Sequence, residues 1–166
     1  MRFAYADPPY LGQARKHYGP DAREVNHQLL IAHLAEFDGW ALSCSTPSLR
    51  TILPMCPADA RVGAWVKPFA IYKPGVNPGY CWEPVIFLPL PRKRTRQEPT
   101  IRDFVSANVT LRRGVSGAKP DDFSRWLFAL AGLNPDDEFV DLFPGSGAVG
   151  YAWDEWRSRM PLGVGA

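Results

Sequence analysis

Asp7, Pro8, Pro9 and Tyr10 follow directly after a short apolar stretch at positions 2–6. That stretch has the composition of a β-strand. Because proline lacks a backbone N–H and has a fixed φ, two consecutive prolines end the strand and hold the acid and the aromatic ring rigidly. A simple turn does not need this rigidity. The motif therefore predicts a site that requires a carboxylate and an aromatic ring in fixed positions.

A second segment that could bind a ligand spans positions 139–150, with the sequence FVDLFPGSGAVG. It predicts a strand, a tight glycine turn and the start of a helix in direct succession. Gly145 and Gly147 would let the backbone approach a ligand, and the amides at the helix start would point at it. An ordinary strand-to-helix turn is the alternative. The segment has neither the GxGxxG of dinucleotide sites nor the Gly-Lys-Ser/Thr of a P-loop, which disfavours nicotinamide and triphosphates.

The composition is typical of a globular protein. The chain has 166 residues, 46% of them apolar, and a net charge of +2, which suits one ordinary domain with a buried core. No apolar run is long enough to span a membrane, and Met1 leads straight into the first predicted strand, so we expect a cytoplasmic protein. Cys44, Cys56 and Cys81 have no metal-ligand spacing, so we expect buried reduced thiols and no metal site.

Predicted strands and helices alternate along the chain. After residues 2–6, we expect strands at 38–46, 60–68, 84–90 and 138–143. We expect helices at 25–37, 47–56, 119–133 and 148–159. The alternation predicts an α/β fold, an open sheet with helices on both faces.

Several segments and helix faces carry further expectations. Residues 69–83 are rich in Pro, Gly and Tyr and predict a long loop of the kind that usually carries function. Residues 91–117 predict no regular element, and residues 161–166 could start one more strand. The inward face of the first helix is expected to hold Val25, Leu29, Leu30, Leu34 and Phe37. That of the third helix is expected to hold Phe123, Leu127, Leu130 and Ala131.

Together, DPPY at 7–10 and DLFPGSG at 141–147 resemble the motif pair of the amino-methyltransferases. These enzymes transfer the methyl group of S-adenosylmethionine (SAM) to an exocyclic amino nitrogen of a nucleobase. WVKP at 65–68 and PGYCWEPVIF at 78–87 look like the middle of phage and bacterial adenine-specific DNA methylases. GAKPDDFSRWL at 117–127 is similar to the segment that precedes the family's cofactor loop.

The order of the motifs, catalytic first and cofactor loop last, resembles the permuted class usually called beta. The resemblance implies a Rossmann-like methyltransferase sheet with helices on both faces, circularly permuted and reduced. It also implies a single methyltransferase domain over residues 1–166, with a short basic recognition region at about 91–117.

The resemblance implies a role for each residue of the first motif. An exocyclic amine is a poor nucleophile because its lone pair is delocalised into the ring, so the enzyme must localise and align it. Asp7 would accept one amino hydrogen and the Pro8 carbonyl the other, while Pro8 and Pro9 keep both acceptors fixed. Tyr10 would stack on a base flipped out of the helix.

The resemblance also implies which residues contact SAM. These residues are Asp7, Lys119, Pro120, Asp141, Phe143, Pro144, Gly145, Ser146 and Gly147. The chain departs from the family near its end. Gly165 stands where an acidic residue would hold the ribose hydroxyls, and the strands expected beyond it are missing. We therefore expect weak cofactor binding, or a contact supplied by another chain or residue.

The basic residues predict contacts with a phosphate backbone. The candidates are Arg15, Lys16, Arg92, Lys93, Arg94, Arg96, Arg112 and Arg113. A solvated surface is an equal alternative for these charges. Trp82 and Glu83 could line the base pocket, although a tryptophan before an apolar strand more often belongs to the core. Packing roles are expected for Trp65, Trp126, Trp153 and Trp156.

The sequence thus predicts a SAM-dependent methyltransferase that acts on the amino group of adenine in DNA, with no membrane partner. DPPY favours adenine, since related cytosine amino-methylases more often begin the motif with Ser. RNA and cytosine stay open as alternative substrates, and a homodimer or a partner subunit stays open as the assembly. The rival from another class is a non-catalytic nucleic-acid-binding subunit that keeps the fold without binding SAM.

Overall fold

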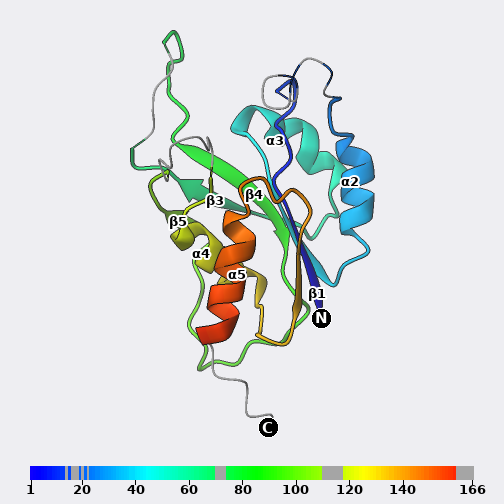
Figure 1. The fold of residues 1–166 in the computed structure, drawn as a ribbon, viewed down its shortest axis with the longest axis vertical. Coiled ribbons are helices and arrows are strands. Elements are labelled where there is room, and N and C mark those ends of the chain that lie inside the picture. Colours follow the sequence, from blue (N-terminus) through cyan, green and yellow to red (C-terminus); the bar gives the residue numbers. More distant parts are fainter. Residues whose placement is uncertain are drawn as a thin grey trace.

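A six-stranded sheet forms the centre of the molecule (Figure 1), in the order β5-β3-β4-β2-β1-β6. The computed structural model describes residues 1–13, 15, 19, 21, 23–69, 74–109 and 118–159. The strands are β1 (Arg2–Ala6), β2 (Gly39–Ser43), β3 (Arg61–Val66), β4 (Trp82–Leu88), β5 (Phe104–Ser106) and β6 (Glu138–Asp141). The helices are α2 (His27–Leu34), α3 (Thr46–Ile52), the 3-10 turn η1 (Leu53–Met55), α4 (Asp121–Ala131) and α5 (Ala148–Arg159).

The directions of the strands place several strand ends at one edge of the sheet. β1 is parallel to β2 and to β6, and β3 is parallel to β5. β4 runs antiparallel to both of its neighbours, β2 and β3. The start of β4 at Trp82 therefore lies at the same edge as the ends of the other strands, at Ala6, Ser43, Val66 and Asp141. We call this side of the sheet the carboxyl edge.

Helices cover both faces of the sheet, which confirms the predicted α/β fold (Figure 1). Successive side chains of a strand point to opposite faces, so Phe3 and Tyr5 of β1 pack in one core cluster and Ala4 and Ala6 in the other. The first cluster lies against α4 and α5, and the second lies against α2 and α3. Each face of the central strand β1 is thus buried.

Local signals explain where the helices begin and end. The side chain of Asn26 accepts a hydrogen bond from the Leu29 amide at 3.1 Å and so caps the start of α2. Pro47 lies in the first turn of α3, and Gly132 ends α4 with a left-handed φ of 74°. One expectation was wrong: Leu29 is 68% exposed, because α2 turns Leu30 and the neighbouring apolar positions toward the sheet instead.

Strand β5 was not predicted from the sequence. It has three residues, of which Phe104 and Ser106 are exposed, so it carries no burial pattern. Pairing with β3 forms this strand, in the register Ala64 to Phe104. A Cβ at Gly63 would lie 2.8 Å from the Asp103 carbonyl oxygen, so this glycine permits the close approach of the segment that leads into β5. Non-local contacts of this kind leave no trace in a local sequence window.

The connection from β3 to β4 is closed at its base. The Lys67 amide donates a hydrogen bond to the Cys81 carbonyl at 2.7 Å, one step beyond the last ladder pair of Val66 with Trp82. The predicted loop therefore ends at Cys81, because β4 begins one residue later. Phe69 and Tyr80 are exposed on this connection. Its described part projects beyond the sheet, at the top of the molecule in Figure 1.

Most of the expected packing residues are in the core. Trp65, Trp126 and Trp153 are buried, as predicted, and the inward face predicted for α4 is buried as well. Trp82 is 37% exposed and is not a core residue. Cys44 is buried, and this burial raises the pKa of its thiol to about 12. Within the described part of the chain, no helix has the length and apolarity to cross a membrane.

Candidate active site

The two sequence motifs meet at the carboxyl edge. In the register of β1 and β6, Tyr5 lies opposite Asp141, and the Leu142 amide donates to the Tyr5 carbonyl at 2.9 Å. Asp7 therefore leaves β1 beside the start of the glycine loop. Burial raises the pKa of the Asp141 carboxyl, and the charge of Asp7 raises it further. The structure thus brings the predicted catalytic and cofactor motifs together.

Lys119 is the most deeply buried charged group of this edge. Its side chain is 5% exposed, and its Nζ lies 3.2 Å from Asp7 Oδ1 and 3.1 Å from Glu83 Oε2. The same ammonium lies 5.0 Å from the ring centroid of Trp65 and 5.4 Å from that of Phe123. Burial would lower the pKa of Lys119, but the neighbouring acidic groups, Asp7 first, raise it well above its usual range. Lys119 is therefore a cation fixed between two carboxylates.

Glu83, which the sequence suggested only as a residue of the base pocket, belongs to the charged cluster around Lys119. It is the second residue of β4, and its second carboxylate oxygen accepts a hydrogen bond from Lys67, the residue after β3. Burial would raise the pKa of Glu83, but the charges of Lys119 and Lys67 lower it to about 2. The pairing of Glu83 with Lys67 has one signal in the sequence: a lysine lies at the end of one predicted strand, and an acid lies next to the start of the following one.

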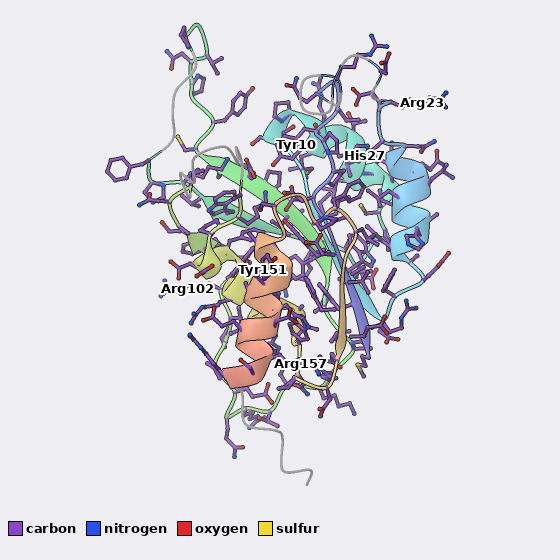
Figure 2. All side chains as sticks on the ribbon, in the orientation of Figure 1. Tyr10, Arg23, His27, Arg102, Tyr151 and Arg157 are labelled. Carbon is purple, nitrogen blue, oxygen red and sulfur yellow. The ribbon has the colours of Figure 1, made fainter. Side chains whose placement is uncertain are left out.

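Tyr10 lies over the same cluster. Figure 2 labels Tyr10 in the upper half of the molecule, on the side of the carboxyl edge. Burial raises the pKa of the Tyr10 hydroxyl well above its usual value, and the negative charges of Asp7 and Glu83 raise it further. At the same edge, the buried Tyr5 hydroxyl lies 2.9 Å from Ser43 Oγ.

Asp7 itself remains open to the outside. Its side chain is 26% exposed, more than that of Glu83 or Lys119. Burial raises the pKa of the Asp7 carboxyl above its usual value, Lys119 opposes this shift, and Glu83 adds to it. The site thus combines an accessible carboxylate with a buried counter-charge behind it.

The glycine loop has the backbone geometry that its sequence requires. Gly145 and Gly147 have φ values of 48° and 74°, which favour glycine. The Phe143 amide donates to Asp141 Oδ1 at 3.1 Å, and the Gly147 amide donates to the Pro144 carbonyl at 2.6 Å. The tip at Pro144, Gly145 and Ser146 is exposed, and α5 begins directly after Gly147. The loop is thus a tight, solvent-facing turn that leads into a helix start.

A cavity of about 620 Å³ lies between the start of α4 and the first two turns of α5. Its lining residues are Ala118, Lys119, Asp121, Asp122, Ala148, Tyr151, Ala152 and Glu155. Figure 2 places Tyr151 on α5, and this side chain is exposed. The cavity therefore combines one buried cation with three acidic side chains, next to Pro120 and the end of the glycine loop. Within the described ranges, no cluster of potential ligands suits a metal ion.

Two of the predicted phosphate contacts lie at the opposite edge of the sheet. Arg92 donates to Asp137 Oδ1 at 2.6 Å and to the Gly132 carbonyl at 2.8 Å, and Arg94 donates to the Ala129 carbonyl at 2.6 Å. These bonds hold the end of α4 to the segment that enters β6. Burial would raise the pKa of Asp137, but hydrogen bonds, with that from Arg92 the strongest, lower it to about 2.

The other predicted basic contacts are distributed differently. Lys93 and Arg96 are exposed next to Arg92, and Arg15 is exposed in the segment after Tyr10. Lys16, Arg112 and Arg113 lie outside the described residues, as does Gly165 with its segment 161–166. The structure therefore does not bring the residues at 92–96 together with Asp7. Among the predicted phosphate contacts that the structure describes, Arg15 lies closest in sequence to the catalytic motif.

Comparison with known proteins supports this architecture. No protein-family model matches the chain, and no curated protein has a matching sequence. A solved structure, the M1.HpyAVI–SAM complex, is similar over 95% of this chain and 78% of its own, with a TM-score of 0.59 at 17% identity. The chain has the fold of that protein. A second structure, of M1.HpyAVI, is similar over 93% of this chain and 76% of its own, with a TM-score of 0.58 at 17% identity.

Removing the charge of Glu83 should destabilise the fold in a pH-dependent way. We expect Glu83→Gln to lower the free energy of unfolding at pH 7 by roughly 3 kcal/mol, because Lys67 and Lys119 lose a buried counter-charge. The native pKa of Glu83, about 2, is below its ordinary value of 4.5. Its stabilisation is therefore complete above about pH 4.5 and disappears as the pH falls through about 2.

Urea unfolding at several pH values measures this effect. The difference between wild type and Glu83→Gln should shrink as the pH falls from 5 toward 2. Glu36→Gln is the matched control, because Glu36 is exposed on the surface and should change stability little at any pH. A difference between wild type and Glu83→Gln that stays constant across this range would contradict the assignment of Glu83 as a buried anion.

Proposed function

We propose that this chain is a SAM-dependent methyltransferase that methylates the exocyclic amino group of adenine in DNA. One observation carries the proposal: Asp7, fixed by two prolines, meets the glycine loop and a buried lysine at one sheet edge. The fold adds support, because it is shared with M1.HpyAVI, which was solved in complex with SAM.

The charged groups at the carboxyl edge are complementary to those of SAM. This cofactor carries a carboxylate, an ammonium and a sulfonium group, and it supplies an electrophilic methyl group when bound. Lys119 offers a cation for the carboxylate, and Asp7 and Asp141 offer anions for the ammonium. The backbone amides of Gly145 and Ser146 at the exposed tip of the loop would hold the same end of the molecule, with Pro120 beside them. A cavity of about 620 Å³ is within the range of small-molecule sites.

The residues of the first motif suit the acceptor amine. Asp7 would accept one amino hydrogen and the Pro8 carbonyl the other, which localises the nitrogen lone pair. As the new nitrogen–carbon bond forms and the carbon–sulfur bond breaks, the nitrogen must lose a proton. The carboxylate of Asp7 is placed to accept it, because it is accessible and burial raises its pKa. Tyr10 would stack on the base.

Methyl-transfer assays test the proposal directly. Purified protein and tritiated SAM are incubated separately with DNA, RNA and protein substrates, and the products are analysed as nucleosides and amino acids. We expect label in N6-methyladenine from DNA. Calorimetry with SAM accompanies the assay, because a chain that neither binds SAM nor transfers the methyl group would instead be the non-catalytic nucleic-acid-binding subunit.

Asp7 should be essential for the reaction. We expect Asp7→Asn and Asp7→Ala to lower kcat by at least about 100-fold, since each removes the anionic acceptor at the reacting amine. Circular dichroism should show an intact fold. Asp136→Asn is the matched control, because Asp136 is exposed near the opposite sheet edge. Near-normal turnover in Asp7→Asn would refute the assignment of the catalytic motif.

Tyr10 should act mainly through its ring. We expect Tyr10→Ala to lower kcat/KM by about 10- to 100-fold, the range of a lost base-stacking contact. Tyr10→Phe keeps the ring and loses only the hydroxyl, so its loss of kcat/KM should stay below about tenfold. Steady-state kinetics on one DNA substrate separates the two variants. Equal losses in both variants would show that the hydroxyl, and not stacking, is what matters.

The glycine loop should tolerate no side chain. A Cβ at Gly147 would lie 3.1 Å from the Tyr151 ring at a φ of 74°, and Gly145 also has a positive φ, so alanine strains the loop at both positions. We expect Gly145→Ala and Gly147→Ala to weaken SAM binding by at least about tenfold in calorimetry. Gly75→Ala is the control, with a φ of 76° and open space around its Cβ. Normal binding by both loop variants would make the loop purely structural.

A further inference from the structure

Four charged side chains form a continuous row of ion pairs from β3 to Asp7. Lys67 pairs with Glu83 Oε1, Glu83 Oε2 lies 3.1 Å from Lys119 Nζ, and the same Nζ lies 3.2 Å from Asp7 Oδ1. The four residues come from four different segments of the chain. Two carboxylates and two ammonium groups alternate along the row, so its net charge is zero.

An aromatic ring aligns the two cations of the row. The ammonium groups of Lys67 and Lys119 lie 4.8 and 5.0 Å from the ring centroid of Trp65. Trp65 is itself fixed, because its Nε1 donates to the Ala107 carbonyl at 2.9 Å. Glu83 bridges the two ammonium groups, and Trp65 and Glu83 are register partners in β3 and β4. The row therefore has little freedom to rearrange.

Stability alone is a weak reason for such an arrangement. Each charge pays a desolvation cost, and well-packed apolar side chains of similar size often replace a buried ion pair without loss. The row also ends at Asp7, the one member that the proposed reaction requires as an accessible carboxylate. Both points suggest a role in setting the state of Asp7.

We propose that Glu83 and Lys67 are positioning residues for this site: Glu83 fixes Lys119 against Asp7, and Lys67 fixes Glu83 and offsets its repulsion of Asp7, so that Asp7 keeps its negative charge. The role in catalysis rests on the function proposed above. The electrostatic link between Lys67 and Asp7 does not, because it follows from the ion pairs themselves.

The charges of Lys67 and Glu83 predict that their removal shifts the pKa of Asp7 in opposite directions. Lys67 lowers the pKa of Asp7 without touching it, and Glu83 raises that pKa through repulsion. Lys67→Met should therefore raise the pKa of Asp7. Glu83→Gln should lower it, since the amide oxygen of the new side chain can still accept a hydrogen bond from Lys119. The other titratable groups that face Asp7 are Tyr5, Tyr10, Cys44, Lys119 and Asp141.

Titration of Asp7 by carbon NMR tests the link without any substrate. The full chain is labelled with ¹³C-aspartate, and the Asp7 carboxyl signal is assigned as the one lost in Asp7→Asn. We expect the midpoint to move to higher pH in Lys67→Met, to lower pH in Glu83→Gln, and back to the wild-type value in Lys67→Arg. Lys93→Met is the control, since Lys93 is exposed near the opposite sheet edge and should not shift the midpoint.

The titration of Asp7 tests the positioning role independently of the proposed function. A midpoint that is unchanged in both Lys67→Met and Glu83→Gln, or that shifts in the same direction in both, overturns the positioning role. Shifts of opposite sign support it, even in a chain that transfers no methyl group, in which case only the proposed function fails. In an active enzyme, we expect Lys67→Met to lower kcat by about 10- to 100-fold with little change in the KM for SAM. It should also move the acidic limb of the pH profile to higher pH.

Discussion

The burial of one ammonium group, that of Lys119, determines how the carboxyl edge is built. A buried charge is stable only where opposite charges and hydrogen bonds compensate its lost hydration. Lys119 obtains this compensation from Asp7 at the end of β1 and from Glu83 at the start of β4. Three segments far apart in the sequence are therefore held together at one point. Packing on both faces of the sheet then fixes the positions of the other side chains around the Lys119 ammonium group.

The reversed direction of β4 makes this compensation available. If β4 were parallel to β2 and β3, its first residues would lie at the other end of the sheet, far from Asp7. Because β4 is antiparallel, its second residue reaches the same edge as the residue that follows β3. Glu83 can thus contact Lys67 and Lys119 at once. The mixed sheet is therefore a condition for the site and not a neutral variation of the fold.

The sequence was sufficient for features with a local signal and insufficient for those made by distant pairs. The alternating strands and helices and the rigid motif at Asp7 could be identified, because proline, glycine and apolar periodicity act within a short window. Strand β5 (Phe104–Ser106) could not, since pairing with β3 and not its own pattern forms it. Charge alone also gave no sign that Arg92 pairs with Asp137, because the two residues are far apart in the sequence. Glu83 was noticed, but its partner Lys67 was not, because their pairing depends on strand register.

The hydrogen bond between Lys67 and Cys81 has a consequence for how this protein can change. It closes the β3–β4 connection at its base, so the intervening residues begin and end at fixed points whatever their length. The ion-pair row lies on the sheet side of this closure, and the exposed Phe69 and Tyr80 lie on the other side. Insertions, deletions or grafted sequences in the connection would thus leave the charged row in place. The fold thus separates the charged row from a surface segment that evolution or an engineer could vary independently.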